Sequence, residues 1–146
     1  MQLSTRTRYG CRAMMELALN QQDSAMPLNK IAARQDISVK YLAQIFPVLR
    51  TAGLVRSIRG PRGGYTLARD PSDIRLSDIV HVLEGSLAPV ECVDAPGLCE
   101  KSGFCATRDV WKALEDRMED VLHSTTLSDL AENQRSKTRA LQDTAG

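Results

Sequence analysis

Three cysteines in the second half of the chain are the residues best suited to carry chemistry. Cys92, Cys99 and Cys105 lie within fourteen residues, with six and then five residues between them. Thiolates that a loop brings together suit a soft metal or an iron–sulfur cluster. Structural zinc sites usually carry ligand pairs two to four residues apart, and this segment has no such pair. The spacing therefore favours a soft-metal or iron–sulfur site over three unrelated buried thiols.

The charged residues divide the chain into a basic and an acidic half. Residues 1–70 contain eleven lysines and arginines against four acidic residues, whereas residues 71–146 contain eight against fourteen. A basic module joined to an acidic one is typical of a protein that binds a polyanion. The alternative is a chance distribution of solvated charges.

The elements that carry these charges can be predicted from periodicity. Apolar residues at helical spacing predict helices near residues 5–20, 28–35 and 38–52, and Ser38 is expected to cap the third. Two short helices with a brief turn between them match a helix-turn-helix. Residues 54–59 and 65–68 flank a Gly-Pro-Arg-Gly-Gly turn and predict a two-stranded wing. Pro47 should bend the third helix or end it at Phe46.

The second half is expected to hold fewer, longer elements. Periodicity predicts a helix from Leu76 to Gly85, a long helix from Thr107 and a short helix from Ser128. We therefore predict a mainly α protein with a winged helix-turn-helix over residues 1–85 and a cysteine-bearing loop over 86–107. A dimerisation helix and the short helix follow over 108–131, and the polar tail over 132–146 is predicted to be disordered.

The N-terminal residues of a recognition helix reach base edges in the major groove, and a wing reaches the adjoining groove. Six residues are therefore predicted to bind DNA: Ser38, Lys40, Tyr41, Gln44, Arg59 and Arg62. Gln44 can pair with adenine, Lys40 can contact guanine or phosphate, and Arg59 suits a narrow minor groove. Arg6, Arg8 and Arg56 are expected to contact phosphates. For each residue alone, a solvated surface charge is the simpler interpretation.

Four stretches together resemble the IscR-type regulators of the Rrf2 family, in the family's order and over nearly the whole length. They are RYGCRAMMELALN, ISVKYLAQIFPVLRTAGLVRSIRGPRGGY, the cysteine loop ECVDAPGLCEKSGFCATRDVW and VWKALEDRMEDVLHSTTLSDLAENQ. The resemblance implies a winged helix, a homodimer formed through the long helix, and an iron–sulfur cluster ligated by the three cysteines. A 2Fe–2S cluster is favoured, with 4Fe–4S as the alternative.

Two positions depart from the IscR-type pattern. A histidine ligand is expected three residues after the last cysteine, where this chain has Arg108, a poor ligand because it stays protonated. The fourth ligand is therefore open, with candidates in Glu91, Asp94, Glu100, Asp109 and, from the first helix of a partner, Cys11 or Glu16. We favour Cys11 as a core thiol. Ala43 stands where the IscR-type pattern has a glutamate, which would reject some DNA sites. The range of DNA sites bound is therefore expected to differ from that of IscR-type regulators.

The sequence thus predicts a DNA-binding transcription regulator whose promoter binding depends on an iron–sulfur cluster. An enzyme is not predicted. The signal would be cluster supply, iron, oxygen, nitric oxide or redox state, and the regulator would act as a repressor or an activator. Expected partners are double-stranded promoter DNA, a second copy of the chain and cluster-assembly proteins. The alternatives are a thiol/disulfide switch, a cluster-free DNA-binding repressor and, more remotely, an iron–sulfur electron carrier.

A cytoplasmic location is expected from the absence of targeting signals. No apolar run approaches the roughly 18 residues that span a bilayer, and MQLSTRTRYG lacks the apolar centre of a secretory signal. The protein is therefore not expected to bind membranes.

Overall fold

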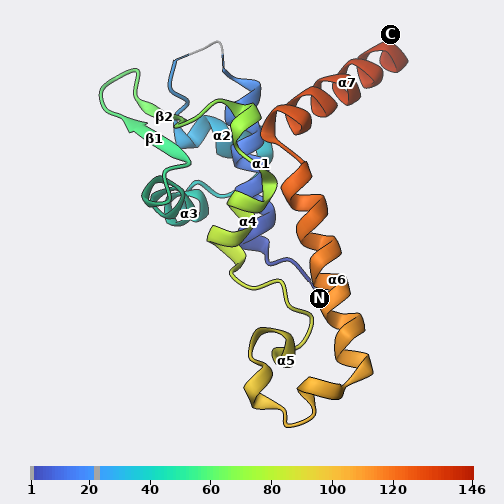
Figure 1. The fold of residues 1–146 in the computed structure, drawn as a ribbon. Coiled ribbons are helices and arrows are strands. Elements are labelled where there is room, and N and C mark those ends of the chain that lie inside the picture. Colours follow the sequence, from blue (N-terminus) through green and yellow to red (C-terminus); the bar gives the residue numbers. More distant parts are fainter. Residues whose placement is uncertain (1, 22–23) are drawn as a thin grey trace.

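Three helices form the helix-turn-helix half of the protein (Figure 1). In this computed structural model, which describes residues 2–21 and 24–146, α1 spans Thr5–Leu19. The short helix α2 spans Leu28–Gln35, and a turn through Asp36, whose φ is 52°, leads into α3 at Val39–Thr51. The Ser38 hydroxyl accepts the Tyr41 amide at 3.2 Å and caps α3, as predicted.

Helix α3 runs through Pro47 without ending. The alternative that it stops at Phe46 is wrong, because helical geometry continues to Thr51. Proline removes one helical hydrogen bond, but Pro47 lies on the exposed side, where water can reach the carbonyl left without a partner. Phe46 and Leu49 are fully buried on the other side and hold both parts of the helix against the core. Tertiary burial thus outweighs the local cost of the proline.

The wing follows α3 directly. Gly53 adopts a φ of 77° and ends the helix, after which β1 (Val55–Ile58) pairs antiparallel with β2 (Gly64–Leu67). The main chain of Met26 also pairs with Tyr65: the Met26 amide donates to the Tyr65 carbonyl with an N to O distance of 2.9 Å, and the Tyr65 amide donates to the Met26 carbonyl at 2.8 Å. Gly64 is needed at this junction, since its φ is 147° and a Cβ there would collide with the Met26 main chain. The wing is therefore attached to the segment that precedes α2.

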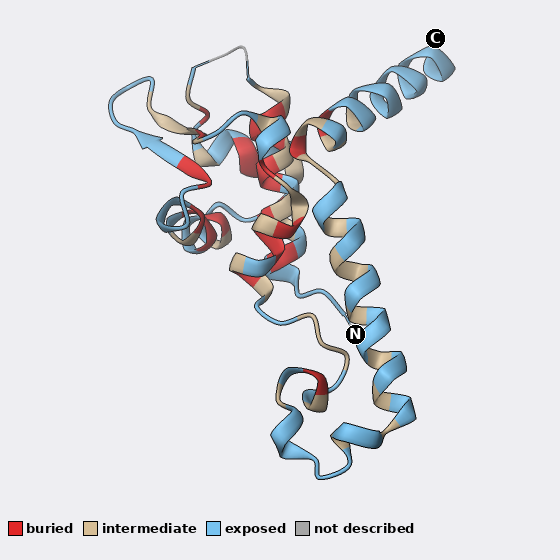
Figure 2. Cartoon of the chain, in the orientation of Figure 1, coloured by how far each residue is buried: buried red, intermediate tan, exposed pale blue. Residues whose placement is uncertain are grey.

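One hydrophobic core lies where α1, α3 and α4 meet. After a short 3₁₀ turn, η1 (Pro71–Asp73), helix α4 (Leu76–Glu84) packs along α1. Figure 2 shows the buried positions concentrated in these helices. The largest fully buried side chains here include Met14, Leu42, Phe46 and Ile79. The low aromatic content is consistent with this core of aliphatic side chains and methionine.

The cysteine segment and two long helices make up the rest of the chain. Its short elements are α5 (Glu91–Asp94), η2 (Pro96–Leu98) and η3 (Ser102–Phe104). Helix α6 (Ala106–Ser124) then runs back beside α4 and buries none of its residues completely (Figures 1 and 2). Within the described ranges, no helix is both long and apolar enough to cross a membrane.

The prediction of a disordered C-terminal tail is wrong, because these residues continue helix α7. It spans Leu127–Ala145, whereas a short helix and a disordered tail over 132–146 were expected. Thr126 and Asp129 form a reciprocal capping box, and Leu127 is fully buried, so the first turn is well anchored. Once a first turn has formed, each further residue adds a hydrogen bond at little cost, which lets a polar sequence continue the helix.

Candidate DNA interface and cysteine segment

The exposed face of α3 carries most of the predicted base-reading residues. Lys40 and Gln44 are exposed on this face, and Ser38 lies exposed at its beginning. Tyr41 is only half exposed, because its ring packs edge-on against Tyr9 with centroids 5.6 Å apart. The structure therefore brings three of the four together at the surface and places Tyr41 between surface and core.

Two apolar side chains on this face were missed by sequence reasoning. Val39 is 46% exposed, and Pro47 is exposed further along the helix. Apolar groups on a recognition face can contact the methyl group of thymine. The sequence does contain a signal for this: Pro47 falls on the same side of the helix as Lys40, away from the apolar stripe that faces the core, and Val39 lies at the edge of that stripe.

Arg59 and Arg62 lie at the tip of the wing, on either side of Gly60 and Pro61, and both are exposed. The Gly63 amide donates to the Gly60 carbonyl at 2.9 Å and closes the turn. The two predicted wing residues are thus held on a structured turn beyond the end of β1.

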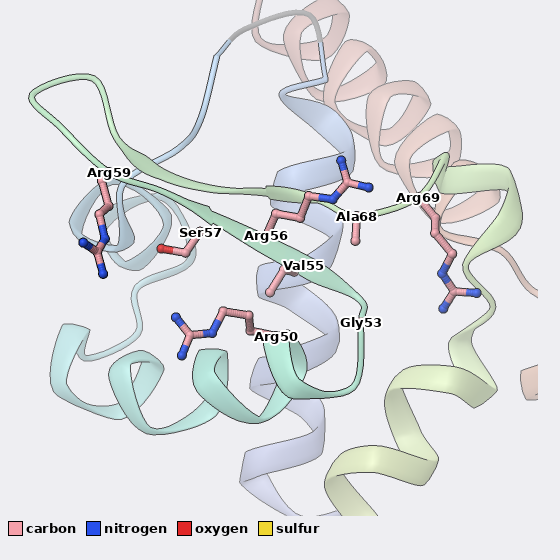
Figure 3. Close-up of a pocket in the computed structure, with 8 residues that line it drawn as sticks. All are labelled: Arg50, Gly53, Val55, Arg56, Ser57, Arg59, Ala68 and Arg69. Carbon is pink, nitrogen blue, oxygen red and sulfur yellow. The ribbon is translucent and has the colours of Figure 1, made fainter.

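A hollow of about 740 Å³ lies between the end of α3 and the base of the wing (Figure 3). Four arginines line it together with small and apolar residues, and we call it the arginine hollow. Its lining residues are Arg50, Gly53, Val55, Arg56, Ser57, Arg59, Ala68 and Arg69. Arg56 and Arg59 are predicted from the sequence to contact DNA, whereas Arg50 and Arg69 are not, because they lie on different elements and meet only in the folded chain.

The cysteine segment, residues 86–105, has almost no core of its own. Val93 is the one buried residue that the structure describes in it. Cys92 and Cys105 are half-buried and Cys99 is exposed, while Leu98 and Phe104 are 71% and 79% exposed. Among residues 2–21 and 24–146, no three His, Cys, Asp or Glu side chains are grouped closely enough to hold a metal ion. The three cysteines share one segment but do not converge in this conformation.

Hydrogen bonds at the start of α6 favour the thiolate of Cys105. Its Sγ lies 3.2 Å from the Thr107 hydroxyl. This hydrogen bond, followed by one from the Arg108 amide, lowers the pKa of the Cys105 thiol below its ordinary value. A lowered pKa makes Cys105 a better metal ligand and a better nucleophile.

Arg108 connects the two ends of the cysteine segment. Its Nε donates to the Cys92 carbonyl at 3.0 Å, which joins α5 to the first turn of α6. The position at which a histidine ligand was expected therefore carries a structural hydrogen bond to the main chain of another expected ligand.

The family profile named Rrf2, described as an iron-dependent transcriptional regulator, matches residues 3–133. The chain belongs to the Rrf2 family. It is 39% identical to the HTH-type transcriptional regulator IscR of Escherichia coli over 134 residues, which is 92% of this chain and 82% of the relative.

Two solved structures share the fold of this Rrf2 chain. CymR, the global cysteine regulator of B. subtilis, superposes with a TM-score of 0.79 at 41% identity, covering 91% of this chain and 98% of CymR. IscR of T. potens superposes with a TM-score of 0.76, also at 41% identity, covering 92% and 88%. The winged-helix prediction is confirmed, and the Rrf2 chain is a DNA-binding transcription regulator and not an enzyme, as predicted.

The two ligand candidates on α1 are engaged within their own domain. Cys11 is packed against the core, and burial raises the pKa of its thiol to about 12. Glu16 is buried, accepts from Gln35 Nε2 at 2.7 Å and lies 3.6 Å from Arg34. Both residues therefore have a structural role on α1 of this Rrf2 regulator.

Proposed function

We propose that this Rrf2 regulator binds promoter DNA as a homodimer and that an iron–sulfur cluster on Cys92, Cys99 and Cys105 controls this binding. One observation carries the proposal: all three thiols lie on an exposed segment with a single buried residue, between the DNA-binding half and α6. A segment without a core is ordered by what it binds. The family's description as iron-dependent points to iron as that ligand.

The residues of the segment fit such a cluster in chemistry. Three thiolates are the donors that iron–sulfur clusters take, and Cys105 has a pKa that favours its thiolate. When bound, a 2Fe–2S or 4Fe–4S cluster would supply an inorganic cross-link between the cysteines. Whether this cross-link is present would depend on cluster or iron supply, oxygen, nitric oxide or redox state. The cysteines would have to move together for this, and an exposed segment allows such movement.

Contacts between α4 and α6 can transmit a change in the segment to the DNA-binding half. His81 Nε2 on α4 lies 2.8 Å from the Glu119 carboxylate on α6. At the end of α6, Arg75 donates to the His123 carbonyl at 2.6 Å and the Leu76 amide donates to the Thr125 carbonyl at 2.8 Å. Helix α6 is thus fixed to α4 at two levels, and a coupling free energy of about 1–3 kcal/mol between the cysteine segment and the DNA-binding face would change DNA affinity about 5- to 150-fold.

The apolar face of α6 supports the homodimer. Val110, Leu114 and Val121 are between 39% and 63% exposed and recur at positions that share one side of a helix. Apolar side chains gathered on one exposed helix face are typical of a surface that a partner covers. Sedimentation of Leu114→Glu should show a shift toward monomer, whereas Glu115→Gln on the adjoining position should leave the dimer intact.

In the proposed complex, α3 reads the major groove with Ser38, Lys40 and Gln44, and the tip of the wing reaches the adjoining groove with Arg59 and Arg62. Tyr41 contributes only the part of its ring that Tyr9 leaves exposed. Ala43 is exposed beside Gln44 and presents no charge to the DNA. The set of bound sites would therefore depend on Lys40 and Gln44.

Anaerobic purification tests the cluster directly. We expect iron, acid-labile sulfide and a visible absorption band, all lost when Cys92, Cys99 and Cys105 are changed to serine. Cys11→Ala is the matched control and should keep the cluster. Cluster-loaded and cluster-free protein should then differ in affinity for a duplex selected from a random library. Colourless protein after anaerobic reconstitution, or equal affinity in the two states, would contradict the proposal.

A thiol/disulfide switch is the second candidate, favoured by the reactivity of the same cysteines. Cys99 is exposed, the pKa of Cys105 is lowered, and the fold is shared with the cysteine regulator CymR. Here two thiols would form a disulfide and pass two electrons and two protons to an oxidant such as peroxide. Protein without iron that changes DNA affinity on peroxide treatment, and recovers on addition of a dithiol, would establish this switch instead.

A further inference from the structure

Arg12 on α1 holds the end of α2. Its Nε donates to the Gln35 side-chain oxygen at 2.9 Å, and Nη2 of the same guanidinium donates to the Gln35 main-chain carbonyl. Gln35 is the last residue of α2, where helical carbonyls lack a partner and carry a partial negative charge. A guanidinium suits this place because it stays protonated and presents its donors in a fixed plane. Arg12 therefore fastens the end of α2 to α1.

The same guanidinium lies over the ring of Tyr9, one turn earlier on α1. Its central carbon is 5.4 Å from the ring centroid, within the distance at which a cation is attracted to an aromatic face. The Tyr9 ring in turn meets the Tyr41 ring edge-on, with centroids 5.6 Å apart. Tyr41 lies in the first turn of α3. One side chain on α1 thus contacts the end of α2 directly and the start of α3 through a single ring.

The residues between these two contacts orient α3. Asp36 takes the left-handed conformation that turns the chain, Ile37 is buried, and Ser38 caps the helix. Because this turn is short, the direction in which α3 leaves it depends on where its two flanking residues, Gln35 and Tyr41, are held. Both are held from α1.

We propose that Arg12 is a positioning residue for sequence recognition, which fixes the direction of α3 against α1 and thereby the reach of Lys40 and Gln44 toward base edges; this inference rests on the proposed DNA-binding function. Hydrogen bonds to base edges weaken steeply when their distance or angle changes, so a small rotation of the helix impairs them. Contacts to phosphates carry no sequence information. Arg12 therefore acts on the discrimination between DNA sequences more than on the affinity for DNA in general.

The experiment uses the whole chain and two fluorescein-labelled duplexes, one of random sequence and one that the wild-type protein has selected from a random library. Arg12 is exposed, so Arg12→Ala leaves the core intact. This variant should weaken binding to the selected duplex about three- to tenfold more than binding to the random duplex. The slope of log affinity against log salt should stay that of the wild type, because no phosphate contact is lost. Arg139→Ala, at an exposed arginine on α7, is the control and should change neither quantity.

Two further variants test the path from Arg12 to α3. Arg12→Lys should recover part of the discrimination, because an ammonium still donates to the Gln35 carbonyl but lacks the planar fork that also lies over the Tyr9 ring. Tyr9→Leu removes the ring between Arg12 and Tyr41. Combined with Arg12→Ala, it should lose less discrimination than the product of the two single losses, because both changes break the same path. Losses that multiply in full would contradict a shared path.

Hydrogen exchange of the protein without DNA measures the hold on α3 independently. The amides of Ile37, Tyr41 and Leu42 are hydrogen-bonded in the turn and at the start of α3. They should exchange faster in Arg12→Ala, while protection in α4 stays unchanged.

Three outcomes would overturn the inference. Equal weakening on both duplexes with a reduced salt slope would make Arg12 a phosphate contact. Equal weakening with a lower midpoint of urea unfolding would reduce its role to the stability of the fold. Discrimination and exchange like those of the wild type in Arg12→Ala would show that α3 is positioned without it. Wild-type protein that binds neither duplex would instead refute the proposed function, and faster exchange in Arg12→Ala would then still support the positioning of α3.

Discussion

The DNA-binding half and the cysteine segment are organised in opposite ways. In the first, Met14, Leu42 and Phe46 are completely buried, and the recognition helix passes through a proline because its flanking residues are held in the core. In the second, Val93 is the one buried residue described, while Phe104 extends into solvent. Burial fixes the geometry of the first region in the absence of any ligand. The second region carries reactive groups on a chain whose conformation its own packing does not determine.

The largest expected difference in stability is between alanine substitutions of the two phenylalanines of the chain. Phe46 is fully buried with its ring centroid 4.7 Å from that of Tyr65, so Phe46→Ala should cost about 3–5 kcal/mol of unfolding free energy. Phe104 is 79% exposed, so Phe104→Ala should change stability by less than about 0.5 kcal/mol. Urea unfolding of the metal-free protein measures both. Similar losses for the two variants would show that the cysteine segment is packed in solution.

The thiols should differ nearly as much in reactivity. With a pKa of about 12, Cys11 has roughly one thiolate in ten thousand molecules at pH 8, whereas Cys99 is exposed and Cys105 has a lowered pKa. Alkylation of reduced, metal-free protein by iodoacetamide should modify Cys99 and Cys105 about a hundredfold faster than Cys11. Mass spectrometry of peptides at timed intervals gives the rates. Labelling in urea should remove the difference, and equal rates in native protein would contradict the burial of Cys11.

A smaller effect is expected from the hydrogen bond between Arg108 and the Cys92 carbonyl. Arg108→Ala should loosen the ends of the cysteine segment by about 1 kcal/mol without lowering the stability of the winged helix. Hydrogen exchange should show faster exchange of amides in residues 91–106 and unchanged protection in α1 and α3. Arg117→Ala, an exposed arginine on the same helix, is the control. Faster exchange throughout the chain would mean that the two regions are not independent.

The smallest expected effect is on the pH dependence of stability, through the contact between the end of α4 and the start of α1. The Glu84 carboxylate accepts hydrogen bonds from the Thr7 hydroxyl and from the Ser4 hydroxyl, which lower its pKa. A lowered pKa in the folded state means that the ionised carboxylate stabilises the fold, and that this contribution is lost as the pH falls through the lowered pKa. Glu84→Gln should therefore destabilise by less than about 1 kcal/mol at pH 7 and progressively less at acidic pH. Glu132→Gln on α7 should show no such difference in thermal melts between pH 7 and pH 3.

Local signals in the sequence were sufficient where one residue decides the outcome. Ser38 marks the start of α3 because its hydroxyl replaces a missing helical partner, and Gly53 marks its end because the left-handed conformation favours glycine. The continuation of α3 through Pro47 could not be predicted in the same way. It depends on burial of Phe46 and Leu49 against helices distant in sequence.

The candidate site shows the same limit. Each predicted DNA-binding residue could be chosen from its place on one element, whereas Arg50 and Arg69 share a hollow only after the end of α3 meets the end of β2. The hydrogen bond between Arg108 and Cys92 likewise spans sixteen residues and has no local signature. What the sequence could not supply were relations between elements, because these depend on the packed core.

The pairing of Met26 with Tyr65 has a mechanical consequence. Two main-chain hydrogen bonds join the wing to the strand-like segment before α2, and Phe46 on α3 packs against the same tyrosine. These contacts couple the recognition helix to the wing, so we expect the two to move as one unit when the protein meets DNA. Under the proposed function, a change at the cysteines would therefore alter the orientation of this unit as a whole.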